Sequence, residues 1–512
     1  MSSYYFTEEH ELFRESLKAF LDKEVKPRID EWEEAGRTSR DVWKKMGEMG
    51  FLGLGYPEQY GGMELDFFYD VVFTEEISKL FSGGFAIHQM VVQYMSAPYI
   101  LKYGSDYLKE KYLPGIISGD LICSIGISEP TAGSDVANIK TTAIREGDHY
   151  IVNGSKTFIT NGVYGDFIVT VVKTDPSAGP AGVSLLVIDR QAEGVSATKL
   201  KKLGWHSSDT AELAFDSVKV PVENLIGAEG QGFYYLMGGL QLERLIAGVA
   251  GYAGCESALE YSLQYMAQRE AFGRPINKFQ VLRHRVAQMA SEIEAVKQFV
   301  LHCSRMHQDG HYVVKECSMA KLLATELSDK VAYQCIQFFG GYGYMEEYKV
   351  ARLFRDSRVG TIGGGSSEIM REIIAKMVID DVSYDEASSD LPKPSTTKAH
   401  PITNGHQAEK PKADISFGDL QKGMQEKAGA AAPLGHTLKF NFGEEQLVID
   451  GTGDQNAVHQ GDLPAECTVN VSVEDFQGLV SGKLNPMNAV MSGKVRIEGD
   501  MGVAMKLQSL FG

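Results

Sequence analysis

The sequence predicts an α+β protein of several domains, in which a helical region, a β region and a second helical region precede a small α/β domain. Three observations predict this arrangement. The chain has 512 residues, more than the roughly 250–300 that one hydrophobic core usually serves. The hydrophobic period over residues 1–380 is helical, then alternating, then helical again. A polar segment then separates this body from the tail.

Composition and charge limit the class of protein. Hydrophobic residues make up 43% and charged residues 23% of the chain, as in soluble globular proteins. With 50 Lys and Arg against 68 Asp and Glu, the formal charge is −18, which disfavours binding to nucleic acid or to an anionic membrane. A polyanionic substrate would therefore need a local basic pocket.

Targeting signals and cysteine spacing give further expectations. No run of about 18 apolar residues is long enough to cross a bilayer. The first residues resemble neither a signal peptide nor a transit peptide, and the last are not a peroxisomal tail, so we expect a cytoplasmic protein. The six cysteines form no CxxC pair, which indicates reduced core thiols rather than zinc ligands or disulfides.

Residues 1–123 are predicted to form a helical domain. Thr7 is a plausible N-cap, and Glu8 and Glu9 after it suit the positive end of a helix dipole. Phe13 and Leu17 continue at helical spacing.

Residues 124–230 are predicted to form a β domain. Short β-branched runs at 167–174, 183–189 and 212–220 are bounded by Gly, Pro and Asp, which is typical of strands and turns.

The helical period returns over residues 231–380. Its clearest stripe, which predicts a long packed helix, consists of Leu282, Val286, Met289, Ile293, Val296 and Val300. The glycine-rich strings 340–344 and 363–368 lack the strand, helix and spacing of a Rossmann fingerprint, so a nicotinamide cofactor is not indicated. Taken alone, these glycines are typical of tight turns.

The chain then changes character twice. Residues 381–413 are rich in Ser, Thr, Pro, Lys and Glu and are predicted to be a flexible linker. Residues 414–512 contain alternating runs at 436–443 and 446–453 and a helical stretch at 473–482, which predicts a small α/β domain.

Seven strings follow one another in a fixed order through the body. They are YPEQYGG (56–62), SEPTAGSDV (128–136), NGSKTFITNG (153–162), KLGWHSSDTAEL (202–213), REAFGRPI (269–276), QFFGGYGY (337–344) and RDSRVGTIGGGSSEIMRE (355–372). Together they resemble the acyl-CoA dehydrogenase family over nearly all of residues 1–380. The resemblance implies an N-terminal helical domain, a middle β domain and a C-terminal four-helix bundle, with FAD bound between them.

The reaction that the resemblance implies is α,β-dehydrogenation of an acyl-CoA thioester. Many members of the family carry the base in a Tyr-Glu-Gly-Thr string, where this chain has glycine at Gly364. The long-chain and isovaleryl branches carry it on an earlier helix, which matches Glu243 here. A Glu beside an Arg on a helix would, taken alone, be a solvated residue, but the paired change favours Glu243 as the base. The resemblance gives the Gly364 amide the role of polarising the thioester carbonyl; the alternative is a turn glycine without that contact.

The same resemblance assigns the FAD contacts. It places the loop after the first strand along the isoalloxazine, an aromatic residue and a Thr near N5, and a Ser-Ser-Glu string near the adenosine half. It further implies contacts across a subunit interface from Arg269 and the Gln337–Gly341 loop, where Tyr342 replaces the usual Asn. The implied FAD residues are Ile125, Ile127, Ser128, Ser134, Phe158, Ile159, Thr160, Arg269, Gln280, Gln337, Gly340, Gly341, Ser366, Ser367 and Glu368.

The substrate contacts are also carried over from the family. They are Ser134, Tyr234, Gln241, Arg244, Gly364 and Gly365. Arg244 would bring positive charge to the CoA end in an acidic chain; a surface ion pair is the alternative. Gln241 stands where Asp is commoner. Acyl length is not fixed by these residues.

Residues 467–511 resemble the sterol carrier protein 2 family, which implies a five-stranded sheet with helices around an apolar tunnel for lipid or acyl-CoA. Met487, Met491, Met501 and Met505 suit such a tunnel or an ordinary core.

The resulting hypothesis is an FAD-dependent acyl-CoA dehydrogenase joined to a lipid carrier. Electrons would pass from an acyl-CoA substrate to an electron-transferring flavoprotein, and no nucleic acid partner is expected. The subunit contacts of the family imply a homo-oligomer, a dimer or a tetramer. The alternatives are an acyl-CoA oxidase that uses oxygen and a lipid-binding protein with a degenerate body.

Overall fold

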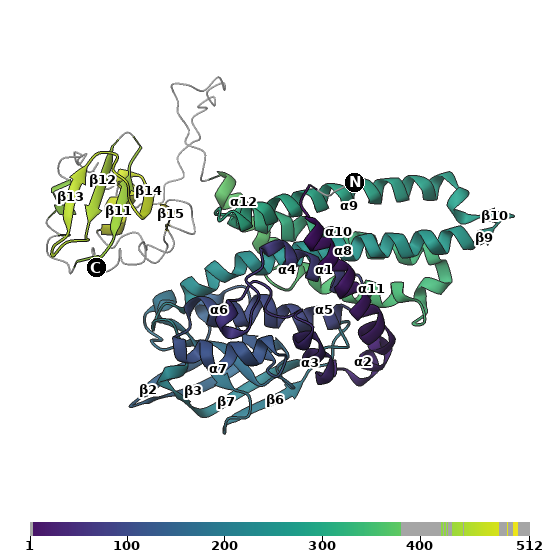
Figure 1. Cartoon of the computed structure of the whole chain (residues 1–512), viewed down its shortest axis with the longest axis horizontal. Coiled ribbons are helices and arrows are strands. Elements are labelled where there is room, and N and C mark those ends of the chain that lie inside the picture. Colours follow the sequence, from purple (N-terminus) through teal and green to yellow (C-terminus); the bar gives the residue numbers. More distant parts are fainter. Residues whose placement is uncertain are drawn as a thin grey trace, which may run out of the picture. The chain divides into compact units, whose positions relative to one another are not determined.

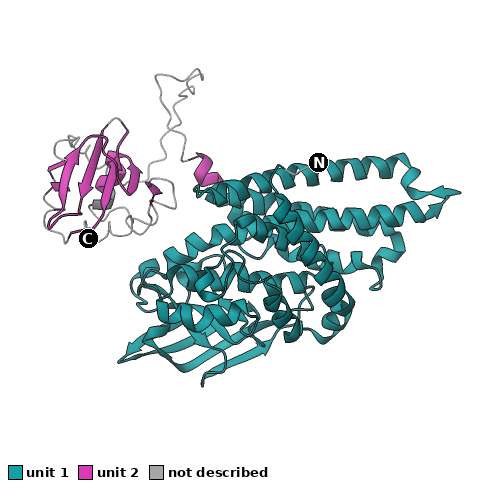
Figure 2. Cartoon of the chain, in the orientation of Figure 1, with its two compact units in different colours: residues 1–372 teal, residues 373–512 magenta. Residues whose placement is uncertain are grey.

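The computed structural model describes residues 4–379, 421–422, 424–425, 428, 433–443, 445–480, 489 and 495–499. The chain divides into two compact units, residues 1–372 and 373–512 (Figure 2). The predicted linker, residues 381–413, lies outside the described residues, as do the four methionines named for the tunnel.

The N-terminal region is helical, as predicted. Thr7 is the N-cap of the first helix and accepts a hydrogen bond from the His10 amide, while Asp66 and Ser105 cap two later helices. The α-helices are α1 (Glu8–Phe20), α2 (Ile29–Ala35), α3 (Arg40–Glu48), α4 (Phe67–Ser78), α5 (Gly83–Met90), α6 (Ala97–Tyr103) and α7 (Asp106–Ile117). The π-helical η1 (Leu21–Val25) and η4 (Val91–Ser96) and the 3-10 turns η2 (Lys26–Arg28) and η3 (Glu58–Tyr60) lie between them.

The predicted β region forms one eight-stranded sheet. Its strands are β1 (Cys123–Gly126), β2 (Thr142–Glu146), β3 (His149–Thr160), β4 (Phe167–Lys173), β5 (Val183–Asp189), β6 (Val195–Lys199), β7 (Thr210–Pro221) and β8 (Leu225–Ile226). The order is β6-β7-β3-β2-β4-β5-β8, and β1 pairs parallel to β4. β4 is buried throughout, which explains why five of its seven residues are apolar.

Helices form the rest of the first unit. They are α8 (Gly232–Gln268), α9 (Gln280–Gln308), α10 (Val314–Phe339), α11 (Lys349–Ser357) and α12 (Ser367–Ile379). The last of them, α12, continues past residue 372 into the second unit. The short hairpin β9 (Glu270–Ala271) and β10 (Arg274–Pro275) joins α8 to α9, and η9 (Gly340–Tyr344) and η10 (Arg358–Thr361) flank α11. The apolar stripe predicted for α9 is confirmed, because Met289, Ile293 and Val300 are buried.

Close packing of α8 on α10 positions the interior of this unit. A Cβ added at Gly251 would lie 2.9 Å from the Cβ of Ala324, so these two backbones approach closely. Figure 1 shows the N-terminal helices between the sheet and the long helices.

The second unit contains a five-stranded sheet, as the resemblance implied. Its order is β13-β12-β11-β14-β15, and only the β11–β14 pair is parallel among the described pairings. The elements are β11 (Thr437–Asn441), β12 (Gln446–Asp450), β13 (Ala457–Gln460), β14 (Cys467–Val471), α14 (Val473–Val480) and β15 (Val495–Gly499). Leu438, Phe440, Ile449 and Phe476 belong to its core.

Two expectations from composition can be compared with the structure. All six cysteines are buried, and no disulfide occurs among the described residues. Within the described part of the chain, no helix combines the length and apolar character needed to cross a bilayer.

Candidate active site

The side chain of Glu243 is buried in the interior of the helical region. It lies on α8 with 6% of its surface exposed, and the Tyr99 hydroxyl on α6 donates a hydrogen bond to its Oε1 at 3.1 Å. Burial raises the pKa of Glu243 to about 7, against the opposing effects of the Tyr99 hydrogen bond and the Arg244 charge. The interpretation of Glu243 as a solvated helix residue is therefore wrong, and a carboxylate poised near neutral pH suits a general base.

Arg244 is also buried, with 7% of its surface exposed, so the alternative of a surface ion pair is wrong. Burial lowers the pKa of Arg244, and the neighbouring Glu243 carboxylate opposes that effect. Its Nε has no hydrogen-bond partner among the residues that the structure describes. A buried guanidinium N–H without a protein acceptor can be satisfied by an acceptor on a ligand.

Lys321 was not identified from the sequence. It lies on α10 with 1% of its surface exposed, and its Nζ donates a hydrogen bond to the Gly365 carbonyl at 2.6 Å. Burial lowers its pKa to about 8, and the charge of Arg244 acts in the same direction. Lys321 thus connects the Gly364–Gly365 turn to the neighbourhood of Arg244.

The Gly364–Gly365 turn requires glycine. Its φ angles are +65° at Gly364 and +97° at Gly365, in the region that side chains rarely adopt. A Cβ added at Gly364 would meet no atom within 4 Å, so there is open space beside the turn. A turn of this kind leaves room for a ligand to approach its backbone.

The end of β3 is strained and exposes an aromatic ring. Phe158 has a φ of +64° and Asn161 a φ of +63°, both unusual for non-glycine residues. The pairing of β3 with β7 shifts register between Lys156 and Ile159, and such bulges often re-aim side chains near functional sites. As a result Phe158 is 72% exposed, while Thr160 ends the strand.

A buried network supports this strained turn. Trp43 Nε1 donates to His88 Nε2 at 2.6 Å, so the neutral His88 carries its proton on Nδ1 and donates to Asn161 Oδ1. Burial lowers the pKa of His88, which favours this neutral form. Arg190 donates to the Gly162 carbonyl at 2.7 Å. These residues were not identified from the sequence, because their contacts join distant segments.

The loop after β1 is fastened to the same end of β3. Lys156 and Glu129 form a buried ion pair at 2.8 Å, and Lys156 also donates to the Ile127 carbonyl at 3.1 Å. The Thr157 amide donates to the Ser128 carbonyl at 2.9 Å. Ile125, Ile127 and Ser128 are half-buried and Ser134 is exposed. The structure therefore brings the Ile125–Ser128 and Phe158–Thr160 groups together.

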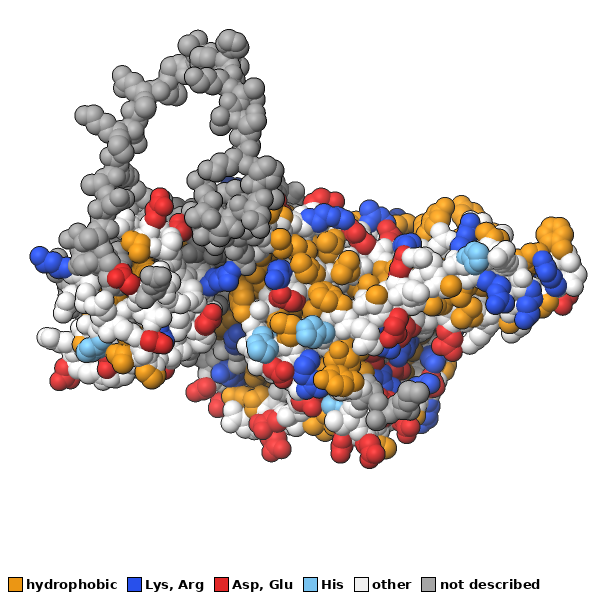
Figure 3. Space-filling model, turned by 90° about the horizontal axis from the view of Figure 1, so that it is seen from above, with side chains coloured by type: hydrophobic (Ala, Val, Ile, Leu, Met, Phe, Trp, Pro, Cys, Tyr) orange, Lys and Arg blue, Asp and Glu red, His pale blue; other side chains and the backbone are white. Residues whose placement is uncertain are grey.

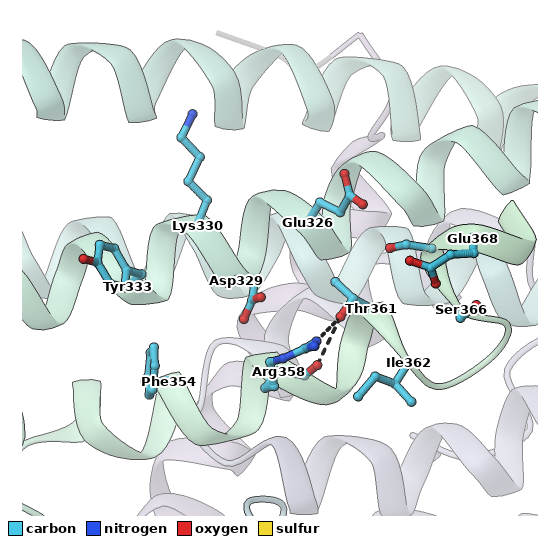
Figure 4. A pocket seen from close by; sticks show the side chains of 11 residues that line it. Glu326, Asp329, Lys330, Tyr333, Phe354, Arg358, Thr361, Ile362, Ser366 and Glu368 are labelled. Atoms are coloured by element: carbon cyan, nitrogen blue, oxygen red, sulfur yellow. Dashed lines mark hydrogen bonds between the residues drawn. The ribbon is translucent and has the colours of Figure 1, made fainter. Parts of the chain in front are cut away.

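A cavity of about 710 Å³ contains the predicted Ser-Ser-Glu string. Glu326, Asp329, Lys330 and Tyr333 of α10 lie on one side of it, and Arg358, Thr361, Ser366 and Glu368 lie near the start of α12 (Figure 4). Ser366 Oγ accepts a hydrogen bond from the Ile369 amide. Ser367 is buried, and within the described ranges its Oγ lacks a hydrogen-bond partner.

The remaining predicted cofactor residues lie elsewhere on the chain. Arg269, Gln280, Gln337, Gly340 and Gly341 are all exposed. Tyr342, which replaces the usual Asn, contacts Arg269: the guanidinium lies 5.6 Å from the centre of the Tyr342 ring. Figure 1 places the β9–β10 hairpin at the far end of the long helices, away from the sheet. Within one chain, Arg269, which directly precedes the hairpin, therefore lies far from the Ile125–Ser128 and Phe158–Thr160 groups.

The two other predicted substrate residues lie on α8. Tyr234 and Gln241 are half-buried, and burial raises the pKa of Tyr234.

The residues present fit FAD in three respects. The exposed Phe158 ring offers a flat apolar surface, there is open space beside Gly364, and Ser367 Oγ is a buried polar atom in a cavity of suitable size. Aromatic surfaces and a few convergent polar groups are typical of cofactor sites.

Comparison with known families agrees with this geometry. Residues 7–120, 124–218 and 230–379 match the N-terminal, middle and C-terminal domains of acyl-CoA dehydrogenase. The chain belongs to the acyl-CoA dehydrogenase family. Residues 417–512 match the SCP-2 sterol transfer family. The protein is therefore an enzyme of a family that uses FAD, with an SCP-2 domain at its C-terminal end.

Individual relatives place it near two branches of the family. It is 40% identical over 381 residues to mouse (Mus musculus) mitochondrial long-chain specific acyl-CoA dehydrogenase, covering 73% of this chain and 88% of that protein. It is 36% identical over 375 residues to mitochondrial isovaleryl-CoA dehydrogenase of Pongo abelii, covering 72% and 88%.

Solved structures give the same result. The acyl-CoA dehydrogenase of Geobacillus kaustophilus is 46% identical with a TM-score of 0.72, covering 74% of this chain and 100% of that chain. A glutaryl-CoA dehydrogenase from Mycobacterium smegmatis, solved in complex with FADH2, is 25% identical with a TM-score of 0.70, covering 74% and 97%.

Proposed function

We propose that this enzyme oxidises an acyl-CoA, long-chain or branched, to the trans-2-enoyl-CoA. The observation that carries the proposal is the buried Glu243 carboxylate, held by Tyr99 and adjacent to Arg244. A carboxylate with a pKa near 7 is largely ionised at slightly alkaline pH and still holds a proton well after accepting one.

The other residues act on the thioester and on CoA. The Gly364 amide would donate to the thioester oxygen as negative charge develops there, and Lys321 fixes the turn that carries this amide. Arg244 would use its unpaired Nε–H on the anionic or carbonyl groups of CoA.

FAD, when bound, supplies the hydride acceptor for the β-hydrogen. Ile125, Ile127, Ser128 and Phe158–Thr160 would hold its ring system, and Ser366–Glu368 its adenosine half.

The test is anaerobic flavin bleaching by a panel of acyl-CoA esters. Glu243→Gln should retain FAD and bind acyl-CoA but bleach at least about a thousandfold more slowly, because no base remains to remove the α-proton. Glu260→Gln, an exposed change on the same helix, is the matched control. Undiminished bleaching in Glu243→Gln would overturn the assignment of the base.

An electron-transferring flavoprotein is the proposed electron acceptor, because it is typical of this family. Turnover with that acceptor should produce enoyl-CoA without hydrogen peroxide. A stoichiometric yield of peroxide in air would instead identify an oxidase.

We propose that the SCP-2 domain carries lipid or acyl-CoA to the dehydrogenase body. A tether raises the effective concentration of a poorly soluble substrate near the active site. Removing residues 381–512 leaves a body of the same extent as the Geobacillus kaustophilus enzyme. Its apparent KM should rise more for long substrates than for short ones; equal changes would contradict a carrier role.

A homo-oligomer is proposed from the exposed surface of the long helices. Figure 3 shows apolar side chains gathered on this part of the molecule. In this region, Phe272 in the turn of the β9–β10 hairpin is 96% exposed and Tyr344 of η9 is 84% exposed. Val281 of α9 and Tyr333 of α10 are exposed as well. Patches of this kind commonly mark subunit interfaces. The same end carries Arg269 and Gln337, which would then reach a neighbour's FAD.

A further inference from the structure

Tyr99 is the group that contacts the Glu243 carboxylate from another helix. It is 2% exposed, and its hydroxyl donates to Glu243 Oε1 at 3.1 Å. The helix that carries it, α6, follows directly after the π-helical η4. An i→i+5 turn changes the direction of the side chains that follow it and occurs frequently at functional sites.

A glycine on α8 makes room for the Tyr99 ring. A Cβ added at Gly239 would lie 2.3 Å from the Tyr99 hydroxyl oxygen and 2.6 Å from Cζ, distances that no side chain can adopt without movement. Gly239 lies one turn before Glu243 on the same helix. Glycine is unfavourable in a helix interior, so its presence here is explained by the space that the Tyr99 ring occupies.

The neighbouring residue pair provides a comparison. Tyr103 lies one turn after Tyr99 on α6 and stacks on Tyr235 with ring centres 4.0 Å apart. A Cβ added at Gly238 would lie 3.2 Å from the Tyr103 hydroxyl, a tight but less severe approach. No hydrogen bond from Tyr103 to Glu243 occurs among the described residues.

Few ionisable groups act on Glu243. Tyr99 faces it from α6 and Arg244 lies beside it on α8. Besides Glu243, the groups that act on Arg244 are Cys317 of α10, Tyr99 and Tyr312, and the charge of Arg244 acts in turn on Lys321 of α10. Tyr103 acts on Tyr99. The hydrogen bond from Tyr99 favours the charged carboxylate, as does the Arg244 charge.

We propose that Tyr99 is a positioning residue, whose hydroxyl orients the Glu243 carboxylate and keeps it in the ionised form that accepts the α-proton, with Gly239 admitting the ring. This inference rests on the proposed role of Glu243 as the base. It explains how a fully buried carboxylate remains able to act as a base near neutral pH.

The test compares Tyr99→Phe with Tyr103→Phe on the FAD-loaded enzyme. The pH dependence of kcat/KM for flavin reduction should have its acid limb shifted upward by about one pH unit in Tyr99→Phe. At pH values above the acid-limb midpoints of both enzymes, the activity of Tyr99→Phe should approach that of the wild type. Tyr103→Phe should keep the wild-type midpoint. An equal loss at every pH, or an unchanged midpoint, would overturn the proposal.

Two further measurements keep the test decisive. Gly239→Ala should displace the Tyr99 ring and shift the midpoint in the same direction, with Gly238→Ala as its control. Infrared difference spectra should show the protonated carboxyl band that Glu243→Gln lacks, titrating at higher pH in Tyr99→Phe than in the wild type. If Glu243→Gln stays active, the proposed base is wrong. If it is inactive but Tyr99→Phe keeps the wild-type midpoint, only the present inference fails.

Discussion

The interior around Glu243 and the exposed end at the β9–β10 hairpin both contain predicted site residues. They differ in burial, because the residues of the interior are enclosed by the chain itself and those of the exposed end are not. Glu243, Arg244 and Lys321 are each less than 10% exposed. The Tyr99 hydroxyl of α6 donates to Glu243, and Lys321 donates to the Gly365 carbonyl. Arg269 and Gln337 are exposed. The groups proposed for proton transfer are thus enclosed within one chain, whereas the proposed cofactor contacts at Arg269 and Gln337 would need the surface of a second subunit.

This difference predicts opposite responses to mutation. A change in the interior should cost stability, because it leaves buried polar or charged groups without partners. A change at the exposed end should leave the fold of one subunit intact and act on association. The three tryptophans, Trp32, Trp43 and Trp205, all lie in residues 1–372, so their fluorescence follows unfolding of the first unit alone.

The largest effect is expected for the ion pair beneath the loops that are proposed to hold FAD. Lys156→Met would leave Glu129, whose side chain is 3% exposed, as a buried carboxylate without its ammonium partner. The free energy of unfolding should fall by about 3–5 kcal/mol, measured by urea denaturation with tryptophan fluorescence. Lys219→Met, an exposed change on β7, serves as the control. A loss below about 1 kcal/mol would mean that the loops do not depend on this pair.

The next effect is the pH dependence that Glu243 gives to stability. Its pKa is about 7 in the folded chain against an ordinary 4.5, because of burial. Between these values the folded state keeps a proton that the unfolded state has released, so stability falls as pH rises through this window. The wild type should lose up to about 3 kcal/mol relative to Glu243→Gln between pH 4.5 and pH 7.

Unfolding at pH 5 and at pH 8 measures this difference. Glu260→Gln should follow the wild-type curve at both values. If the free energy of unfolding of the wild type and of Glu243→Gln changes equally between the two pH values, burial does not raise the pKa of Glu243.

A smaller effect is expected at the strained turn after β3. Asn161→Ala removes the acceptor for His88 and two hydrogen bonds to backbone carbonyls, each of 3.2 Å. The free energy of unfolding should fall by about 1–3 kcal/mol, and flavin reduction should slow even though Thr160 is unchanged. Asn138→Ala, at an exposed position, is the control. Normal reduction in Asn161→Ala would argue that the turn is held without His88.

The sequence predicts the larger features of this molecule because they depend on local pattern. The change from helical to alternating period is predicted at residue 124, and β1 begins one residue earlier, at Cys123. The stripe on α9 follows from residues three and four apart. Thr7 caps α1 because its side chain needs only the next three residues.

The contacts that complete the site depend on distant segments, and no local pattern encodes them. Lys321 reaches Gly365 from a different helix, and Tyr99 reaches Glu243 from another part of the chain. Judged only by its neighbours in the sequence, Glu243 is predicted to be a solvated residue. The resemblance to a family is what indicates a role for it in the active site. Gly239 is explained only once the Tyr99 ring is seen against it.

The smallest effect on the fold is expected at the exposed end. Phe272 is 96% exposed with a φ of +52°, and Asn tolerates this backbone conformation better than a bulky residue does. Phe272→Asn should therefore change the free energy of unfolding by no more than about 0.5 kcal/mol, while weakening subunit association and FAD retention on dilution. Sedimentation and flavin absorbance across a dilution series measure both. If the wild type keeps FAD equally well as a monomer, no neighbouring subunit contributes to the site. The exposed residues at the hairpin would then need another explanation.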